Sequence, residues 1–561
     1  MKEQNEQEVA FNLAVVLCAA AGTAFFFGAI LVLFFAKKRA ARLAAIPISK
    51  VLITSALLLA FGFLIAALSK HFRDLHPNIR FTGIFGLWLI SGGFAFGSMP
   101  LWIKHFMKTN ITVADLDDPP QPVDLKDQLG AQGKSIIGLS LKSRTEVFLT
   151  ENDRVMHTLI SGSTGSGKTT LLKSLYADAC KKQQPVIIID PKGNNKTVEE
   201  FRQIAIALGV PPEKFKLFSI INPNASSRYN PLSRGTAMQI RDRLMGGLEF
   251  SEQFYKNQVS TWLGGAIEIL KALNIEVSCN VLHRMLTDRK YLDELEKIIT
   301  ALPDKDRGKN LLERLRVNAK AGAQNQDGLI SQLRDLDNIE FGHLLNPNDP
   351  ATTLELSQVV ANSEIAYFQL NVMAYEVSAT VIGKLILQDL KSLASQIHGE
   401  VINVKTDFLP IFVDEFGSFA IEGFIDFLKM CRDVRFANHL FFQSLADLDA
   451  VSPEFKAQVQ ANCKTKIVLR SDDPADSDYW SSVAGTEDVI EQSHQVESFG
   501  PFTMRTGAGN ARNSKQMKVE HDVFKQLAIG QSVILQKAPA KEDLVNLWLP
   551  NPDSIINKKA A

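Results

Sequence analysis

The stretch that decides the fold is Ser161-Gly162-Ser163-Thr164-Gly165-Ser166-Gly167-Lys168-Thr169-Thr170. An apolar run at 156–160 precedes it, which is typical of a buried strand, and residues 171–180 follow with helical periodicity. The pattern G-x-x-x-x-G-K-[ST] between a strand and a helix is that of a phosphate-binding loop. A glycine-rich loop without a ligand is the competing interpretation, and the flanking strand and helix disfavour it.

Each residue type in this loop suits a nucleotide bound with Mg²⁺. Glycines let backbone N–H groups turn toward the phosphates, and the helix N-terminus adds its positive end. Lys168 can reach the β and γ oxygens, and the Thr169 hydroxyl can hold Mg²⁺. The predicted contacts with ATP are Gly162, Ser163, Thr164, Gly165, Ser166, Gly167, Lys168, Thr169 and Thr170.

Two further hydrophobic runs end in acidic residues, as buried parallel strands in α/β proteins do. The run 186–190 ends in Asp190 and is followed by Pro191-Lys192-Gly193. The run 409–413 is followed by Asp414 and Glu415. We expect Asp414 to hold Mg²⁺ through water and Glu415 to accept a proton from the attacking water.

A fourth strand at 439–442 ends in Gln443, whose amide could sense the γ-phosphate or could simply cap a turn. Arg432 and Arg435 lie on the segment before that strand, and Arg470 closes a strand at 465–469. An arginine that reaches a neighbouring subunit's γ-phosphate would stabilise transition-state charge. A solvated basic face explains these arginines equally well.

Between the second and third strands the chain has helical periodicity, with helices expected at 240–247, 254–273, 281–287, 291–301 and 311–320. The expected organisation is an all-helical domain at 236–350, inserted into a P-loop domain formed by 141–235 and 351–545. Arg314, Arg316 and Lys320 belong to a basic cluster at 305–320, which makes them candidate DNA contacts. A solvated helix face is the alternative.

The N-terminal part differs from the rest in charge. The chain of 561 residues has 61 basic and 61 acidic residues, yet residues 1–108 carry 11 basic and four acidic ones, and 109–561 carry 50 and 57. Uncharged runs at 9–36, 51–69 and 81–103 are long enough to span a bilayer as helices. The basic loop between the first two runs predicts a cytoplasmic loop, and with three spans everything after residue 103 is cytoplasmic. The alternative prediction is two membrane spans.

The remaining segments connect or end these domains. Residues 109–140 are expected to be a linker and 546–561 a C-terminal tail. A Gly/Asn-rich stretch within 485–530 indicates a mobile loop, and a last strand is expected at 533–535.

The chain resembles type IV secretion coupling proteins of the VirD4/TraG/TraD kind, which belong among the RecA-like hexameric ATPases. The resemblance depends on the N-terminal apolar runs, the P-loop, Asp190-Pro191-Lys192-Gly193, Asn230-Pro231-Leu232, Val413-Asp414-Glu415-Phe416, Gln443-Ser444 and Ala461-Asn462-Cys463. It implies an α/β, RecA-like P-loop domain with an inserted helical domain and N-terminal transmembrane helices. It also implies ATP and Mg²⁺ as cofactors, with roles for Thr169, Asp414, Glu415 and Gln443 as given above.

The resemblance further implies a homo-hexamer embedded in the bacterial inner membrane, with its ATPase domain in the cytoplasm. The implied partners are single-stranded DNA with its relaxase or relaxosome, and components of the secretion channel. Many such proteins have two spans around a larger periplasmic loop, whereas three runs and an 11-residue second loop at 70–80 are counted in this sequence. The leading functional hypothesis is an ATPase that translocates single-stranded DNA, and the alternative is a receptor ATPase that hands over effector proteins. A third hypothesis is a secretion-channel assembly ATPase, which the three N-terminal spans disfavour.

Overall fold

The structure is a computed structural model, which describes residues 111–116, 130, 133–250, 252–322, 326–346, 353–402, 407–499, 502–537 and 539–548. The chain divides into two units, Met1–Thr109 with Lys142–Thr145, and Asn110–Leu141 with Glu146–Ala561. All elements below belong to the second unit. No helix within the described residues has the length and apolar character to cross a bilayer, and the expected spans at 9–36, 51–69 and 81–103 lie outside those residues.

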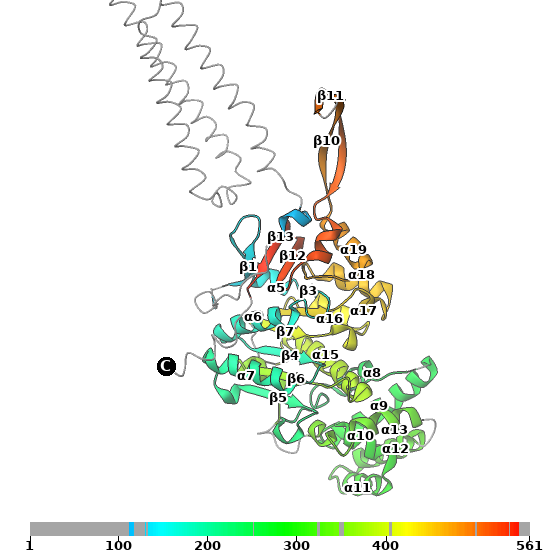
Figure 1. The fold of residues 1–561 in the computed structure, drawn as a ribbon. Helices are drawn as coiled ribbons and strands as arrows, with labels where there is room; N and C mark the ends of the chain where they lie inside the picture. Colours follow the sequence, from blue (N-terminus) through cyan, green and yellow to red (C-terminus); the bar gives the residue numbers. More distant parts are fainter. Residues whose placement is uncertain are drawn as a thin grey trace, which may run out of the picture. The chain divides into compact units, whose positions relative to one another are not determined.

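One eleven-stranded sheet organises the second unit, in the order β2-β1-β13-β12-β9-β3-β8-β7-β4-β6-β5 (Figure 1). The strands from β9 to β5 pair in parallel, while β12, β13, β1 and β2 extend the sheet by antiparallel pairing. The parallel strands are β3 (Thr158–Ser161), β4 (Val186–Asp190), β5 (Phe215–Ser219), β6 (Ile365–Gln369), β7 (Leu409–Val413), β8 (Phe436–Phe442) and β9 (Thr465–Val468). The antiparallel strands are β1 (Lys134–Ser140), β2 (Glu146–Thr150), β12 (Gln531–Lys537) and β13 (Ala540–Leu547).

Helices cover both faces of the sheet, which is why β3, β4, β6, β7, β8 and β9 are buried at every position. Alternate side chains enter opposite cores: Ile188 packs with α6 (Lys168–Lys181) and α7 (Asn195–Ala207), and Ile187 with α15 (Glu376–His398). The other helices are α5 (Glu151–Val155), α14 (Leu356–Ala361), α16 (Phe424–Met430), α17 (Ala446–Asp449), α18 (Pro453–Asn462), α19 (Pro474–Ala484) and α20 (His521–Gln526).

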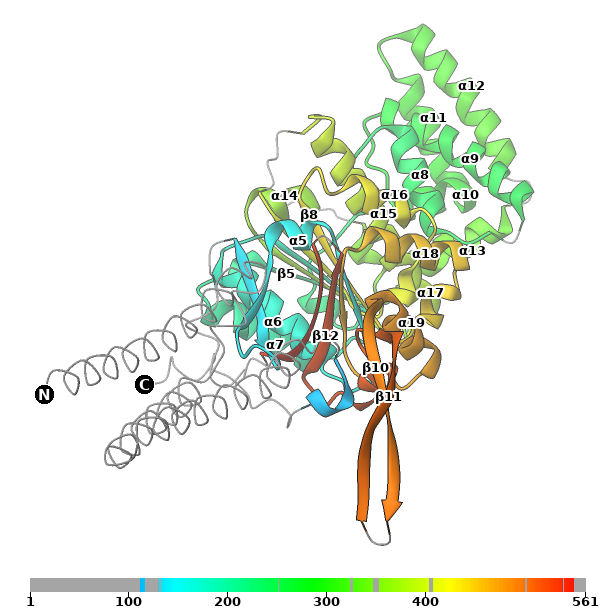
Figure 2. The ribbon, with the colours of Figure 1, turned by 90° about the horizontal axis from the view of Figure 1, so that it is seen from above.

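The segment between β5 and β6 holds a group of helices, here called the helical insertion (Figure 2). Its members are α8 (Ala237–Gly247), α9 (Gln253–Ala272), α10 (Cys279–Thr287), α11 (Arg289–Thr300), α12 (Lys305–Gly322) and α13 (Asp327–Leu336). A buried ion pair of 3.0 Å between Arg243 on α8 and Asp389 on α15 joins the insertion to the helices that cover the sheet. Tyr229 donates a hydrogen bond of 2.9 Å to the same aspartate.

Three sequence expectations are corrected by these elements. Residues 134–140, placed in the linker, form β1, because their backbone pairs with both β2 and β13. The expected tail begins too early, since β13 continues to Leu547. The expected mobile loop contains a two-stranded hairpin, β10 (Thr486–Phe499) and β11 (Phe502–Met517). A ladder of backbone hydrogen bonds does not require apolar side chains, so glycine and asparagine do not exclude it.

Candidate nucleotide site

Four polar strand ends meet at one edge of the sheet, here called the P-loop edge. Because β3, β4, β7 and β8 run in parallel, their carboxyl ends align: Ser161 pairs with Phe442, and Val413 with both Ile189 and Leu440. The residues that follow these strands are the P-loop after β3, the turn after β4, Asp414 and Glu415 after β7, and Gln443 after β8. Ligands of open α/β sheets bind at such carboxyl ends.

The P-loop has a backbone that only glycine adopts readily. Gly165 and Gly167 have φ angles of 76° and 110°, in the left-handed region, and Gly167 caps α6. A Cβ on Gly162 would lie 2.8 Å from the Leu469 Cβ, so close packing against the next strand end excludes a larger residue. The Ser163 N–H donates to the Arg470 carbonyl at 2.8 Å, which ties the loop to the end of β9. The predicted loop is therefore a rigid turn before a helix N-terminus.

Lys168 is the first residue of α6, and its side chain folds back over the loop. Its Nζ donates to the Gly162 carbonyl and, at 3.3 Å, to the Ser163 carbonyl. Burial lowers the pKa of Lys168, and the cationic Lys192 lowers it further, while Glu415 and Asp414 act in the opposite direction. The ammonium group is thus held among the residues that the sequence assigns to the phosphates.

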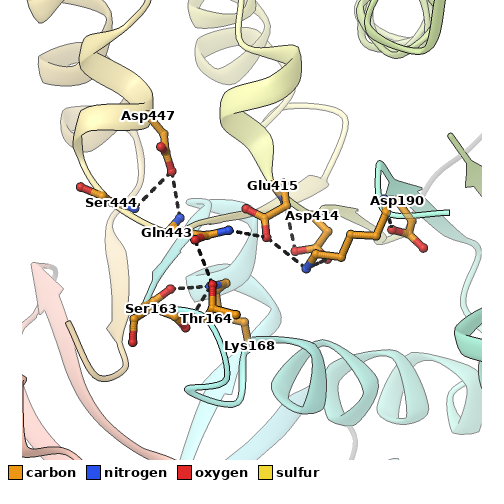
Figure 3. Close-up of polar contacts among 11 residues, drawn as sticks. Ser163, Thr164, Lys168, Asp190, Asp414, Glu415, Gln443, Ser444 and Asp447 are labelled. Atoms are coloured by element: carbon orange, nitrogen blue, oxygen red, sulfur yellow. Dashed lines mark hydrogen bonds and ion pairs between the residues drawn. The ribbon is translucent and has the colours of Figure 1, made fainter. Parts of the chain in front are cut away.

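Asp414 and Glu415 continue β7 into this edge. Asp414 is 5% exposed, its N–H donates to the Ile189 carbonyl at 3.0 Å, and its Oδ1 accepts from the Glu415 N–H at 3.1 Å. Glu415 has φ 44° and ψ 51°, a left-handed conformation that costs a non-glycine residue about 1–2 kcal/mol. In this conformation the Glu415 carboxylate faces Gln443 (Figure 3).

Gln443 connects the two halves of the site. Its Nε2 donates to the Glu415 Oε1 at 3.1 Å, and its Oε1 accepts from the Thr164 hydroxyl at 3.1 Å (Figure 3). The amide therefore bridges the P-loop and the carboxylate expected to activate water. The Gln443 side chain does not cap the turn. Asp447 does so instead, because its carboxylate accepts hydrogen bonds from the Gln443 and Ser444 N–H groups, at 3.1 and 3.2 Å.

Lys192 belongs to this site although no role was assigned to it from the sequence. Its Nζ lies 2.9 Å from the Asp414 Oδ2 and 3.1 Å from the Glu415 Oε1. Burial works against its charge, but Asp414 and Glu415 outweigh this and raise the pKa of Lys192. The available sequence signal was its place in Asp190-Pro191-Lys192-Gly193, directly after a strand of the same sheet.

The candidate arginines occupy two different edges. Arg432 and Arg435 precede β8, so the seven residues of that strand separate them from Gln443 by about 20 Å. The Arg432 Nη2 donates to the Asn462 carbonyl at 2.5 Å, and Arg435 bonds to the Asp407 carbonyl. Arg470 lies at the P-loop edge and pairs with Asp472 at 3.4 Å. Neither Arg432 nor Arg435 is brought to the site of its own subunit.

The three candidate DNA contacts lie on α12, but they do not form one patch. Arg314 pairs with Glu268 of α9 at 3.1 Å, and Arg316 with Glu296 of α11 at 3.3 Å. Residues two positions apart point to different sides of a helix, so Arg314 faces α9 and Arg316 faces α11. Lys320 is exposed one turn after Arg316.

The donor set at the P-loop edge suits a nucleotide with Mg²⁺. The hydroxyl oxygens of Ser163 and Ser166 are buried without a hydrogen-bond partner among the described residues, and they lie in the loop expected to surround phosphates. Thr169 and Asp414 offer the oxygen ligands that Mg²⁺ prefers. These residues fit the cofactors that the sequence predicts.

Comparisons with known proteins agree with this geometry. A family model described as the central domain of helicase HerA matches residues 137–388, and one described as the TraM recognition site of TraD and TraG matches residues 409–531. The type 4 coupling protein DotL of Legionella pneumophila is 23% identical over 505 residues, which cover 76% of this chain and 64% of that relative. The chain is therefore similar to type IV coupling proteins. It spans 64% of the length of DotL.

The solved structure of a coupling protein shows the same fold as this chain. The unbound bacterial conjugative coupling protein TrwBdeltaN70 superposes with a TM-score of 0.50 at 14% sequence identity, over 74% of this chain and 90% of that chain. The expected resemblance to coupling proteins and the P-loop α/β ATPase fold are therefore confirmed.

Proposed function

We propose that this protein is a coupling protein, an inner-membrane ATPase of a type IV secretion or conjugation system. In this proposal it binds ATP with Mg²⁺, and hydrolysis drives recruitment of single-stranded DNA with its attached relaxase and transfer to the secretion channel. The observation that carries the proposal is the Gln443 amide, which bonds to Thr164 in the P-loop and to Glu415. This arrangement links the presence of phosphates at the loop to the position of a general base.

Each residue has a distinct chemical task. ATP and Mg²⁺ supply the phosphoanhydride and the charge that polarises it. Lys168 neutralises phosphate charge, while Thr169 and Asp414 would hold the cation. Glu415 orients the attacking water and accepts its proton at a carboxylate oxygen, and Gln443 keeps that carboxylate facing the loop.

A homo-hexamer would bring in the groups that a single subunit lacks. Arg432 and Arg435 lie at the far edge of the sheet, so either could act only on the nucleotide of a neighbouring subunit. Arg470 lies at the P-loop edge of its own subunit and is a candidate for acting on the nucleotide there. We propose Arg432 or Arg435 as the arginine that reaches the γ-phosphate of the neighbouring subunit. Membrane anchors at 9–36, 51–69 and 81–103 would keep the ATPase domains of this ring in the cytoplasm.

The second candidate function is a receptor ATPase that hands over effector proteins. The ion pairs of Arg314 and Arg316 favour it, because acidic partners already offset part of the positive charge that DNA phosphates would need. For the DNA proposal, Lys320 and the exposed parts of both arginines, 58% and 65% of their side chains, supply the contacts.

One experiment tests both the activity and the substrate. The ATPase rate of the purified full-length chain is measured against protein concentration, with and without single-stranded DNA, and the Glu415→Gln variant gives the background. A rate per subunit that rises with concentration and with DNA supports a DNA-dependent oligomeric ATPase. Wild-type turnover equal to that of the variant contradicts the ATPase, and turnover indifferent to DNA with tight binding of a secreted protein supports the receptor.

A further inference from the structure

The turn Asp190-Pro191-Lys192-Gly193 has no task in the chemistry above, yet it is built rigidly. The Asp190 carboxylate is 4% exposed, accepts the Lys192 N–H at 2.9 Å and accepts the Tyr367 hydroxyl at 2.7 Å. The Val372 N–H donates to the Pro191 carbonyl at 3.0 Å. The backbone of Lys192 is thus fixed to its own strand and to β6.

Gly193 completes the turn in a conformation that suits glycine. Its φ angle is 69°, and an added Cβ would lie 2.5 Å from the Ile221 Cδ1 and 2.9 Å from the Asn371 Cβ. Only a residue without a side chain lets the chain leave β4 so close to its neighbours. The turn therefore presents Lys192 from a fixed point at the P-loop edge.

The Lys192 side chain crosses from the end of β4 to the end of β7. Its ammonium contacts both acidic residues, at 2.9 Å for Asp414 and 3.1 Å for Glu415. The same Glu415 oxygen also accepts from Gln443 at 3.1 Å. Two donors from different strands thus hold one oxygen of a residue whose backbone is strained.

The contact with Asp414 has a second consequence. The Asp414 Oδ1 accepts a hydrogen bond from the Glu415 N–H, and the Asp414 Oδ2 accepts one from Lys192, so both carboxylate oxygens are already bonded. A divalent cation near Asp414 is repelled by an ammonium group at 2.9 Å. Lys192 is 47% exposed and has a flexible four-carbon stem, so it can leave Asp414 while it stays with Glu415.

We propose that Lys192 is a positioning residue that holds the Glu415 carboxylate for hydrolysis and competes with Mg²⁺ for Asp414. This inference rests on the proposed ATPase function. It also explains the rigid turn. Asp190, Pro191 and Gly193 fix the backbone of Lys192, so that its side chain can leave Asp414 while it stays in contact with Glu415.

The test uses Lys192→Met in the full-length chain, with two readouts that should move in opposite directions. The first is kcat, which we expect to fall about 10-fold because Glu415 loses a charged donor. The second is the Mg²⁺ concentration that gives half-maximal binding of a fluorescent ADP analogue, which we expect to fall about 3-fold because a competing cation is gone. A residue that only supports the fold would impair both hydrolysis and binding.

Two further variants serve as controls. Lys192→Arg keeps the charge and should recover most of the turnover and the wild-type Mg²⁺ dependence. Lys196→Met removes an exposed lysine four residues away on α7 and should change neither readout. Circular dichroism spectra that match the wild type exclude a folding defect.

The outcomes separate this inference from the proposed function. Unchanged kcat in Lys192→Met overturns the positioning role, and an unchanged or higher Mg²⁺ requirement overturns the competition. Loss of nucleotide binding in this variant shows a structural role and overturns both. Wild-type protein without turnover contradicts the proposed ATPase instead, and the Mg²⁺ titration still tests the competition.

Discussion

The P-loop edge and the basic helix α12 place charged residues in opposite ways. At the P-loop edge the charges come from strands far apart in the sequence, Lys168 and Asp414 are buried, and each charge has a defined partner. On α12 they are neighbours in the sequence, exposed to solvent, and paired with acids of α9 and α11. Charges that are close in the sequence are therefore a weaker sign of a site than charges that the sheet topology brings together.

The largest effect is expected for Lys168→Ala. The ammonium over the P-loop carries charge that no other described residue of the loop supplies, so ATPase turnover should fall at least about 1,000-fold. Phosphate release under steady-state conditions measures this, and binding of a fluorescent ATP analogue should weaken as well. Turnover near the wild-type level would remove Lys168 from its assigned role.

Glu415→Gln should lower turnover about 100-fold or more while the nucleotide still binds. The variant keeps the side-chain shape but removes the negative charge, and with it the ability to accept a proton. Single-turnover hydrolysis and equilibrium binding, measured together, distinguish this loss from that of Lys168→Ala. Weakened binding comparable to Lys168→Ala would contradict a role limited to the chemical step.

The ion pair between Arg243 and Asp389, which joins the helical insertion to α15, can be tested through stability. Arg243→Met leaves Asp389 buried without its cation, and breaking such a pair costs about 3–5 kcal/mol of unfolding free energy. Thermal and denaturant unfolding measure the change. The double variant Arg243→Met/Asp389→Leu should recover much of it, and a double variant less stable than the single one would argue against charge burial as the cause.

Gln443→Ala should reduce turnover about 10-fold, because the bridge between Thr164 and Glu415 is lost while both ends remain. The rate of the chemical step should fall more than nucleotide affinity does. Gln443→Glu is the matched variant, since it keeps the length but places a second carboxylate beside Glu415. An unchanged ATPase rate in Gln443→Ala would show that the Gln443 amide is only a local structural contact.

The smallest effect is expected from α12. Replacing Arg314, Arg316 and Lys320 with Ala should weaken DNA binding a few-fold and flatten its dependence on salt by about 0.7 logarithmic units per lost phosphate contact. Fluorescence anisotropy with single-stranded DNA at several salt concentrations measures this. If the salt dependence of DNA binding is unchanged, these residues do not contact DNA and only form ion pairs within the protein.

Much of the fold follows from patterns that are local in the sequence. Continuous apolar runs predicted β3, β4, β7, β8 and β9, and helical periodicity predicted α8–α11 within a few residues and the later part of α12. β1 and the β10–β11 hairpin were missed, since their ladders depend on backbone pairing with partners that a single strand does not reveal. α13 was missed as well.

The sequence by itself determined the phosphate-binding loop, because turn, lysine and hydroxyl lie within ten consecutive residues and their chemistry is local. It also determined the acidic end of β7 and the residue type at Gln443. Only the tertiary structure decided that Gln443 bridges Thr164 and Glu415, that Lys192 contacts both carboxylates, and that Arg432 and Arg435 lie at the other edge. The physical reason is strand order: neighbours in a parallel sheet come from distant segments, and the order in which they pair is set by packing across the whole domain.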